Sequence, residues 1–192
     1  DRLSGGRLGY VHISSMDDPS FRSVYADILG KYNDREGIVI DTRFNGGGRL
    51  HEDIEILFSG KKYFTQVVRG REACDMPSRR WNKPSIMLTC EANYSNAHGT
   101  PWVYQHQGIG KVVGMPVPGT MTSVSWETLQ DPTLYFGIPI VGYRLPDGSY
   151  LENKQLEPDV KIANSPEKII KGEDEQLETA VKELLKEIDS KK

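Results

Sequence analysis

Two short segments of this chain are apolar almost throughout, GIVID at 37–41 and PSIMLTC at 84–90. Runs of this kind are typical of strands that are buried on both faces of a sheet. One amphipathic stretch precedes the first segment and another follows it, so strands and helices alternate along the first ninety residues. This alternation predicts an α/β fold with a mostly parallel sheet flanked by helices.

The other elements are predicted from periodicity and from turn residues. Strands are expected at 7–13, 62–70 and 110–114, and helices at 18–32, 50–60 and 96–107. Residues 115–146 are rich in proline, glycine and β-branched residues, which indicates hairpins, and Pro-Asp-Gly at 146–148 is a strong turn signal. A single apolar stripe predicts a C-terminal helix at about 173–189; it consists of Leu177, Ala180, Val181, Leu184, Leu185 and Ile188.

Composition narrows the classes of protein to consider. The chain has 192 residues, of which 37% are hydrophobic and 27% charged, and this suits one globular domain with a real core. Its net charge of -3 gives no reason to expect nucleic acid or a membrane surface as a partner. No apolar stretch approaches the roughly 20 residues that a membrane span needs. Because the chain opens with DRLSGGRLGY and has no initiator Met, we expect it to be a piece of a longer protein.

The cysteines and the potential metal ligands are sparse. Cys74 and Cys90 form no CxxC motif, and two buried thiols are the favoured interpretation, with a single disulfide as the alternative. The His, Asp and Glu residues show no metal-ligand spacing. We therefore expect neither a metal nor a cofactor.

Two motifs follow the apolar strands, DTRFNGGG at 41–48 and EANYSNAHG at 91–99. Ligands usually bind at strand ends in a parallel α/β sheet. If the two strands are neighbours, the glycines and Ser95 face one crevice. Glycines can approach a substrate closely, so they could line an oxyanion hole, with amides from Gly46 or Gly47. A tight strand-to-helix turn is the plainer alternative, and a phosphate-binding loop is weak because no GK[ST] or GxGxxG follows.

Ser95 precedes a predicted helix, where free amides could stabilise an oxyanion. The Asn96 amide would be one donor, and Ser95 the nucleophile. The sequence alone favours an ordinary helix N-cap at Ser95. His51 and His98 could each be proposed as a base, but a partly exposed polar residue is the simpler interpretation of both.

Five segments, taken in order, resemble the tail-specific, or C-terminal processing, serine peptidases. They are GRLGYVHI, GIVIDTRFNGGG, NYSNAHG, GIGKVVG and LPDGSYLENKQLEPDVKI. The tricorn protease branch is the closer match, and the similarity covers nearly the whole chain. The resemblance implies a ClpP/crotonase-like layered fold and a peptidase core domain spanning 1–192. It also implies an upstream PDZ domain in the same protein.

The resemblance assigns roles residue by residue. Residues 41–48 match the family's D-x-R-x-N-x-G-G pattern, whose glycines supply an oxyanion amide. Ser95 takes the place of the nucleophile, and Asn96 stands where tricorn-type enzymes have an acid. Glu152 matches a glutamate that completes the tricorn tetrad; without the resemblance it reads as an exposed strand-edge acid.

Two departures bear on the mechanism. Thr120 occupies the position of the lysine base used by the tail-specific branch, so a Ser-Lys dyad is absent. Tricorn-type enzymes use a histidine from a segment upstream of the PDZ domain, and no histidine here matches it. We therefore expect the base to come from an upstream segment and the isolated chain to be nearly inactive.

The expected function is hydrolysis of peptides or unfolded polypeptide, with substrate aligned partly by β-addition to an edge strand. The alternatives are a non-catalytic peptide-binding scaffold and, more weakly, an acyl-CoA crotonase relative. Tricorn relatives form rings, so a homo-oligomer is compatible with the resemblance. The compartment stays open, because archaeal relatives are cytosolic whereas many bacterial ones are exported.

Overall fold

A parallel sheet forms the centre of the computed structural model, which describes residues 1–192. Its order is β1-β2-β5-β6-β9 and every neighbouring pair is parallel. The strands are β1 (Leu8–His12), β2 (Gly37–Asp41), β5 (Ser85–Thr89), β6 (Lys111–Gly114) and β9 (Val160–Lys161). Every residue of β2 and β5 is buried. The prediction of a parallel sheet from these two apolar segments is confirmed.

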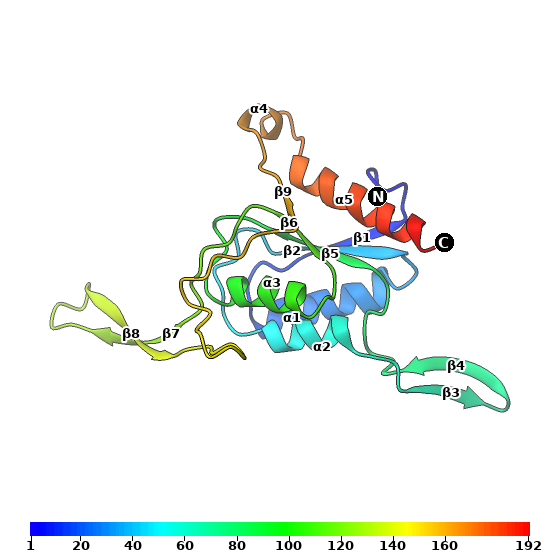
Figure 1. Cartoon of the computed structure of the whole chain (residues 1–192), viewed down its shortest axis with the longest axis horizontal. Helices are drawn as coiled ribbons and strands as arrows, with labels where there is room; N and C mark the ends of the chain where they lie inside the picture. Colours follow the sequence, from blue (N-terminus) through cyan, green and yellow to red (C-terminus); the bar gives the residue numbers. More distant parts are fainter.

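Helices cover both faces of the sheet (Figure 1). One face carries α1 (Asp18–Ala26), α2 (His51–Ser59) and α3 (Asn96–His106), and the other carries α5 (Glu175–Ser190). Successive strand residues point to opposite faces, so Ile38 and Ile40 pack in the larger core with α1, α2 and α3. Val39 packs in the smaller core against α5. The layered fold with a C-terminal helix is as predicted.

Local capping explains where two of these helices begin. The Asp17 side chain accepts a hydrogen bond from the Ser20 amide at the start of α1, and a proline occupies the first turn. The Asp174 side chain accepts one from the Leu177 amide at the start of α5. Each cap satisfies an amide that has no partner within its own helix.

Two hairpins stand away from the layers in Figure 1. They are formed by β3 (Phe64–Val68) with β4 (Arg71–Met76), and by β7 (Ser123–Thr128) with β8 (Tyr135–Val141). The strand expected at 62–70 therefore pairs with the segment after it and does not join the central sheet. Its residues are mostly exposed, which a strand inside that sheet would not be.

Several elements were not predicted. A short helix, α4 (Pro166–Ile169), precedes α5; the helix expected at 18–32 is present, but as α1 followed by a π-helical turn, η1 (Asp27–Lys31). β9 has two residues, too few to produce a pattern. Both cysteines are free thiols; Cys90 is buried as expected, whereas Cys74 is exposed because it lies on the β3–β4 hairpin. None of the helices has the length and apolar character that crossing a membrane would require.

Candidate active site

The glycine segment and Ser95 meet at the carboxyl ends of β2 and β5, which are neighbours in the sheet. The Tyr94 amide donates to the Asn45 carbonyl at 3.0 Å. The Asn45 side chain donates to the Ile13 carbonyl at 2.8 Å, so it ties the segment to the end of β1. A Cβ atom added to Gly47 would lie 2.6 Å from Ser95 Cβ. The two motifs thus adjoin, as the sequence predicted for neighbouring strands.

The three consecutive glycines, Gly46 to Gly48, differ in what packs against them. A Cβ on Gly46 would have no other heavy atom within 4 Å. Gly47, at φ +99°, packs against Ser95. Gly48, at φ +137°, packs against the Met16 carbonyl, and the adjacent Arg49 amide donates to that carbonyl at 2.7 Å. Only the second and third glycines are needed for close backbone approach.

Ser95 has an unusual backbone. Its φ is 55° and its ψ is -122°, a region that residues with a Cβ rarely adopt. Such a conformation costs on the order of 1–3 kcal/mol and is found where surrounding structure enforces it. The Ser95 hydroxyl makes no hydrogen bond and does not cap α3. The ordinary N-cap interpretation therefore does not describe this serine.

Two candidate oxyanion amides are free of protein acceptors. The Asn96 amide belongs to the first turn of α3 and makes no hydrogen bond. The Gly46 amide, in the segment after β2, makes no hydrogen bond either. The Gly47 amide instead donates to Asn45 Oδ1 at 2.8 Å. Of the two glycines considered from the sequence, Gly46 therefore has the available donor, while Gly47 provides the space beside Ser95.

Residues 120–122 connect Ser95 with Glu152. The Ser95 amide donates to Thr120 Oγ1 at 3.2 Å. The next two amides, of Met121 and Thr122, donate to Glu152 Oε2 at 2.8 and 2.6 Å. Burial raises the pKa of Glu152, but the hydrogen bonds from Thr122 and Met121 outweigh it and lower the pKa below its ordinary value. Glu152 is therefore a fixed carboxylate near the serine, and not a free strand-edge acid.

Neither nearby histidine is hydrogen-bonded to the Ser95 hydroxyl. His51 Nδ1 lies 2.8 Å from the side-chain nitrogen of Asn96. His98 is fully buried on α3 and both of its ring nitrogens lack a hydrogen-bond partner. Burial lowers the pKa of His98, so the ring is neutral at pH 7.

Comparison with known proteins decides the family. The model of peptidase family S41 matches residues 7–162. The chain belongs to peptidase family S41. Within this family it is similar to tricorn protease homolog 1 of Streptomyces coelicolor, with 28% identity over 93% of this chain and 17% of that protein. It is also similar to tricorn protease of Thermoplasma acidophilum, with 25% identity over 96% of this chain and 17% of that protein.

The fold agrees with this placement. The crystal structure of tricorn protease superposes with a TM-score of 0.83 at 23% identity, covering 98% of this chain and 18% of that one. The chain spans no more than 22% of the length of the curated relatives it matches. It is thus a tricorn-like S41 chain that corresponds to one part of those larger proteins.

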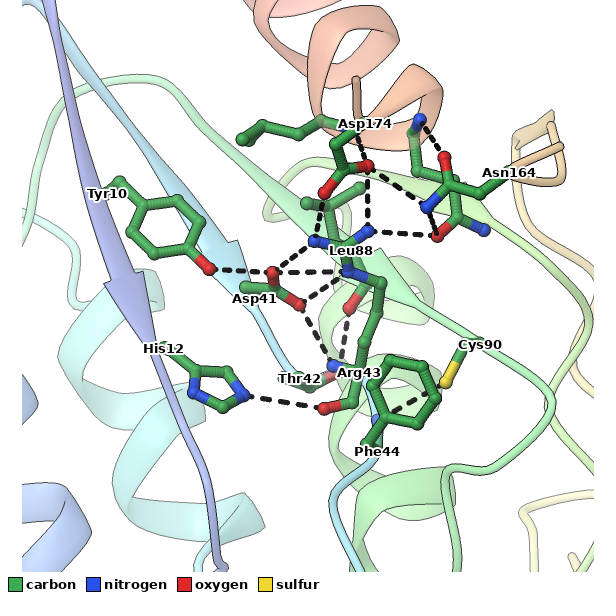
Figure 2. A network of polar contacts seen from close by, with 12 residues as sticks. Tyr10, His12, Asp41, Thr42, Arg43, Phe44, Leu88, Cys90, Asn164 and Asp174 are labelled. Carbon is green, nitrogen blue, oxygen red and sulfur yellow. Dashed lines mark hydrogen bonds and ion pairs between the residues drawn. The ribbon is translucent and has the colours of Figure 1, made fainter. Parts of the chain in front are cut away.

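Asp41 and Arg43, at the end of β2, belong to a largely buried ion cluster (Figure 2). Arg43 binds Asp41 at 2.6 Å and Asp174 at 2.8 Å, and the Tyr10 hydroxyl donates to Asp41 at 2.8 Å. Burial raises the pKa of Asp174, but the Arg43 guanidinium outweighs it and lowers the pKa below its ordinary value. Nothing in the local sequence pairs Asp174 with residue 43, so this link between β2 and α5 was not predicted.

A cavity of about 610 Å³ lies one helical turn along α3 from Ser95, and neither Ser95 nor the glycine segment lines it. Its walls come from α2, α3, the segment after β8 and the segments around residues 121 and 151; among the lining residues are His51, Gly99, Trp102, Met121, Tyr143 and Leu151. Gly99 lies one helical turn beyond Ser95, and Met121 follows Thr120. The cavity combines apolar walls with a few polar groups, as ligand sites commonly do.

Proposed function

We propose that this chain is the serine peptidase core of a larger tricorn-like enzyme, with Ser95 as the nucleophile. One observation carries the proposal above all: Ser95 is held in a strained conformation at a helix start, with a free hydroxyl, directly against Gly47. A serine that merely capped a helix would not need this conformation. Membership of family S41 supports peptide as the substrate class.

The proposed first step is attack on a peptide carbonyl. The Ser95 hydroxyl gives its proton to a base as Oγ bonds to the carbonyl carbon, and the C=O electron pair moves onto oxygen. The amides of Asn96 and Gly46 stabilise that oxyanion; Gly47 could do so only by releasing Asn45. The C–N bond then breaks, the amine takes a proton, and water hydrolyses the acyl-enzyme.

The base is proposed to be a histidine from an upstream segment, placed near the Glu152 carboxylate. Glu152 is already fixed by two backbone amides and stays ionised at neutral pH, so it could support a charged imidazolium in that segment. The substrate side chain next to the scissile bond would enter the neighbouring cavity, whose apolar walls favour an apolar or aromatic group.

Labelling with a fluorophosphonate probe tests the nucleophile. We expect the full gene product to be labelled and to hydrolyse peptides, and Ser95→Ala to abolish both. The isolated 192-residue chain should show little or no turnover, because an unassisted serine hydroxyl is a poor nucleophile. Ser95-dependent turnover by the isolated chain would refute the upstream base. A full gene product that Ser95→Ala leaves unchanged would refute the peptidase and favour the scaffold.

A further inference from the structure

The Asn96 side chain links the starts of α2 and α3 beside the proposed nucleophile. Its Oδ1 atom accepts hydrogen bonds from the Leu50 amide at 2.8 Å and the His51 amide at 3.1 Å. Leu50 has no side-chain group to cap α2, so Asn96 supplies the acceptor that this first turn needs. Because two donors face this atom, it must be the amide oxygen, and the nitrogen Nδ2 lies at the other position.

The position of that nitrogen fixes the protonation state of His51. Nδ2 lies 2.8 Å from Nδ1 of the His51 ring. An amide nitrogen can only donate, so Nδ1 accepts and the neutral ring carries its proton on Nε2. Nε2 bonds to no protein group, and His51 lines the cavity proposed to receive substrate.

A charged His51 could not keep this contact. An imidazolium has a proton on both nitrogens, so two N–H groups would face each other across 2.8 Å. Rotating the Asn96 amide by half a turn would remove this N–H to N–H contact. It would, however, direct the Asn96 amide nitrogen at the Leu50 and His51 backbone amides, which are also donors. The Asn96 side chain therefore has one satisfied arrangement, and that arrangement requires neutral His51.

We propose that His51 is a positioning residue for the oxyanion-binding amide of Asn96. The inference rests on the proposed function, since the Asn96 amide is the donor assigned there. His51 touches no reacting atom. It holds the Asn96 side chain, which is 2% exposed, against the start of α2. This keeps the Ser95 backbone in its strained conformation, which leaves the Asn96 amide free.

The surroundings of His51 keep the ring neutral. Burial lowers the pKa of His51 and outweighs the opposing effect of the Glu52 carboxylate. Its charged and titratable neighbours are Arg49, Glu52 and Asp53 in the same stretch of chain, His106 of α3, and Tyr143, Arg144 and Asp147 after β8. Since the ordinary pKa of about 6.5 is lowered, the Asn96 contact is present at pH 7 and is lost only as the pH falls through the lowered value.

The proposal is tested in the full gene product by replacing His51 with side chains that each reproduce one nitrogen of its imidazole ring. In His51→Asn the side-chain oxygen can take the place of Nδ1, whereas in His51→Gln the amide reaches toward the place of Nε2. We expect His51→Asn to keep kcat within about twofold, and His51→Gln and His51→Ala to lose about tenfold in kcat with a smaller change in KM, as expected for roughly one hydrogen bond. Glu52→Gln, on the exposed side of α2, is the matched control and should match the unsubstituted protein at pH 7.

A spectroscopic measurement covers the case in which a variant folds poorly. Imidazole ¹⁵N chemical shifts should show Nδ1 unprotonated in the unsubstituted protein. In Asn96→Asp, a carboxylate replaces the amide donor, so the proton should move to Nδ1 and the pKa of His51 should rise. A proton on Nδ1 in the unsubstituted protein, or a His51→Gln variant with unchanged kcat, would overturn the proposal. An unsubstituted gene product without Ser95-dependent turnover would instead refute the proposed function, and the nitrogen shifts would still decide the His51 tautomer.

Discussion

Replacing Gly47 by alanine tests whether the glycine segment is shaped for Ser95. Gly47 has φ +99°, which an L-residue avoids, and we expect about 1–3 kcal/mol of backbone strain. The new Cβ would lie 2.6 Å from Ser95 Cβ and 2.8 Å from the Tyr94 carbonyl oxygen. Overpacking of this kind adds about 1–3 kcal/mol. The free energy of unfolding should therefore fall by about 2–6 kcal/mol, a large share of the roughly 5–15 kcal/mol typical of a domain.

Gly46→Ala is the matched control. It is the adjacent glycine, its φ is not in the left-handed region, and its added Cβ would meet no other heavy atom within 4 Å. Its free energy of unfolding should change by less than about 1 kcal/mol, with a gain favoured because alanine restricts the unfolded chain. Urea denaturation of both variants at pH 7 measures the difference.

The second readout is the rate at which the fluorophosphonate probe labels Ser95 in the full gene product. The overlap in Gly47→Ala is relieved by moving Ser95 or Tyr94, so the labelling rate should fall together with stability. Equal urea midpoints for the two alanine variants would refute the packing argument. A destabilised Gly47→Ala protein that labels at the normal rate would show that the glycine segment does not position Ser95.

Two further substitutions test strain and charge. Ser95→Gly should remove the cost of the positive φ and raise the free energy of unfolding by about 0.5–2 kcal/mol while abolishing labelling; a less stable variant in urea would contradict the strain at Ser95. Asp174→Asn keeps an acceptor for the α5 cap but removes a charge from Arg43. The folded pKa of Asp174 is lowered, so its contribution is complete above the ordinary value of about 3.9 and is lost as the pH falls through the folded pKa. The stability difference between Asp174→Asn and the unsubstituted protein should therefore be present at pH 7 and shrink below about pH 4; a difference independent of pH would contradict the ion pair.

The central sheet was predictable because burial on both faces leaves a strong signal in the residues themselves. GIVI at 37–40 has no polar residue, which is typical of a strand covered on both faces. The segment 62–70 is rich in strand-forming residues too, but strand propensity does not say which partner a strand pairs with. Its hairpin partner at 71–76 contains Arg, Glu and Asp, and because of these charged residues the segment was not predicted to be a strand.

The candidate site was predictable in part. The sequence predicted that Ser95 meets the glycines if their two strands are neighbours, and the structure shows that β2 and β5 are neighbours. The backbone strain at Ser95 could not be predicted from the sequence. A serine before a helix is usually an N-cap, and residue types do not specify backbone angles. The His51–Asn96 contact was missed for a related reason. It joins residues 45 positions apart whose chemistry is unremarkable until the two helix starts are placed side by side.

The contacts of the motif at 41–48 indicate that it positions Ser95. Asp41 and Arg43 anchor the end of β2 to α5, and Arg43 is almost fully buried in doing so. Asn45 then fixes the turn to β1 and to Tyr94, and Gly47 leaves the room that Ser95 occupies. The charged side chains of the motif thus bind one another, Tyr10 and residues at the start of α5. Their loss should act through stability and through the placement of Ser95, because all of their hydrogen bonds go to other residues and none goes to the Ser95 hydroxyl.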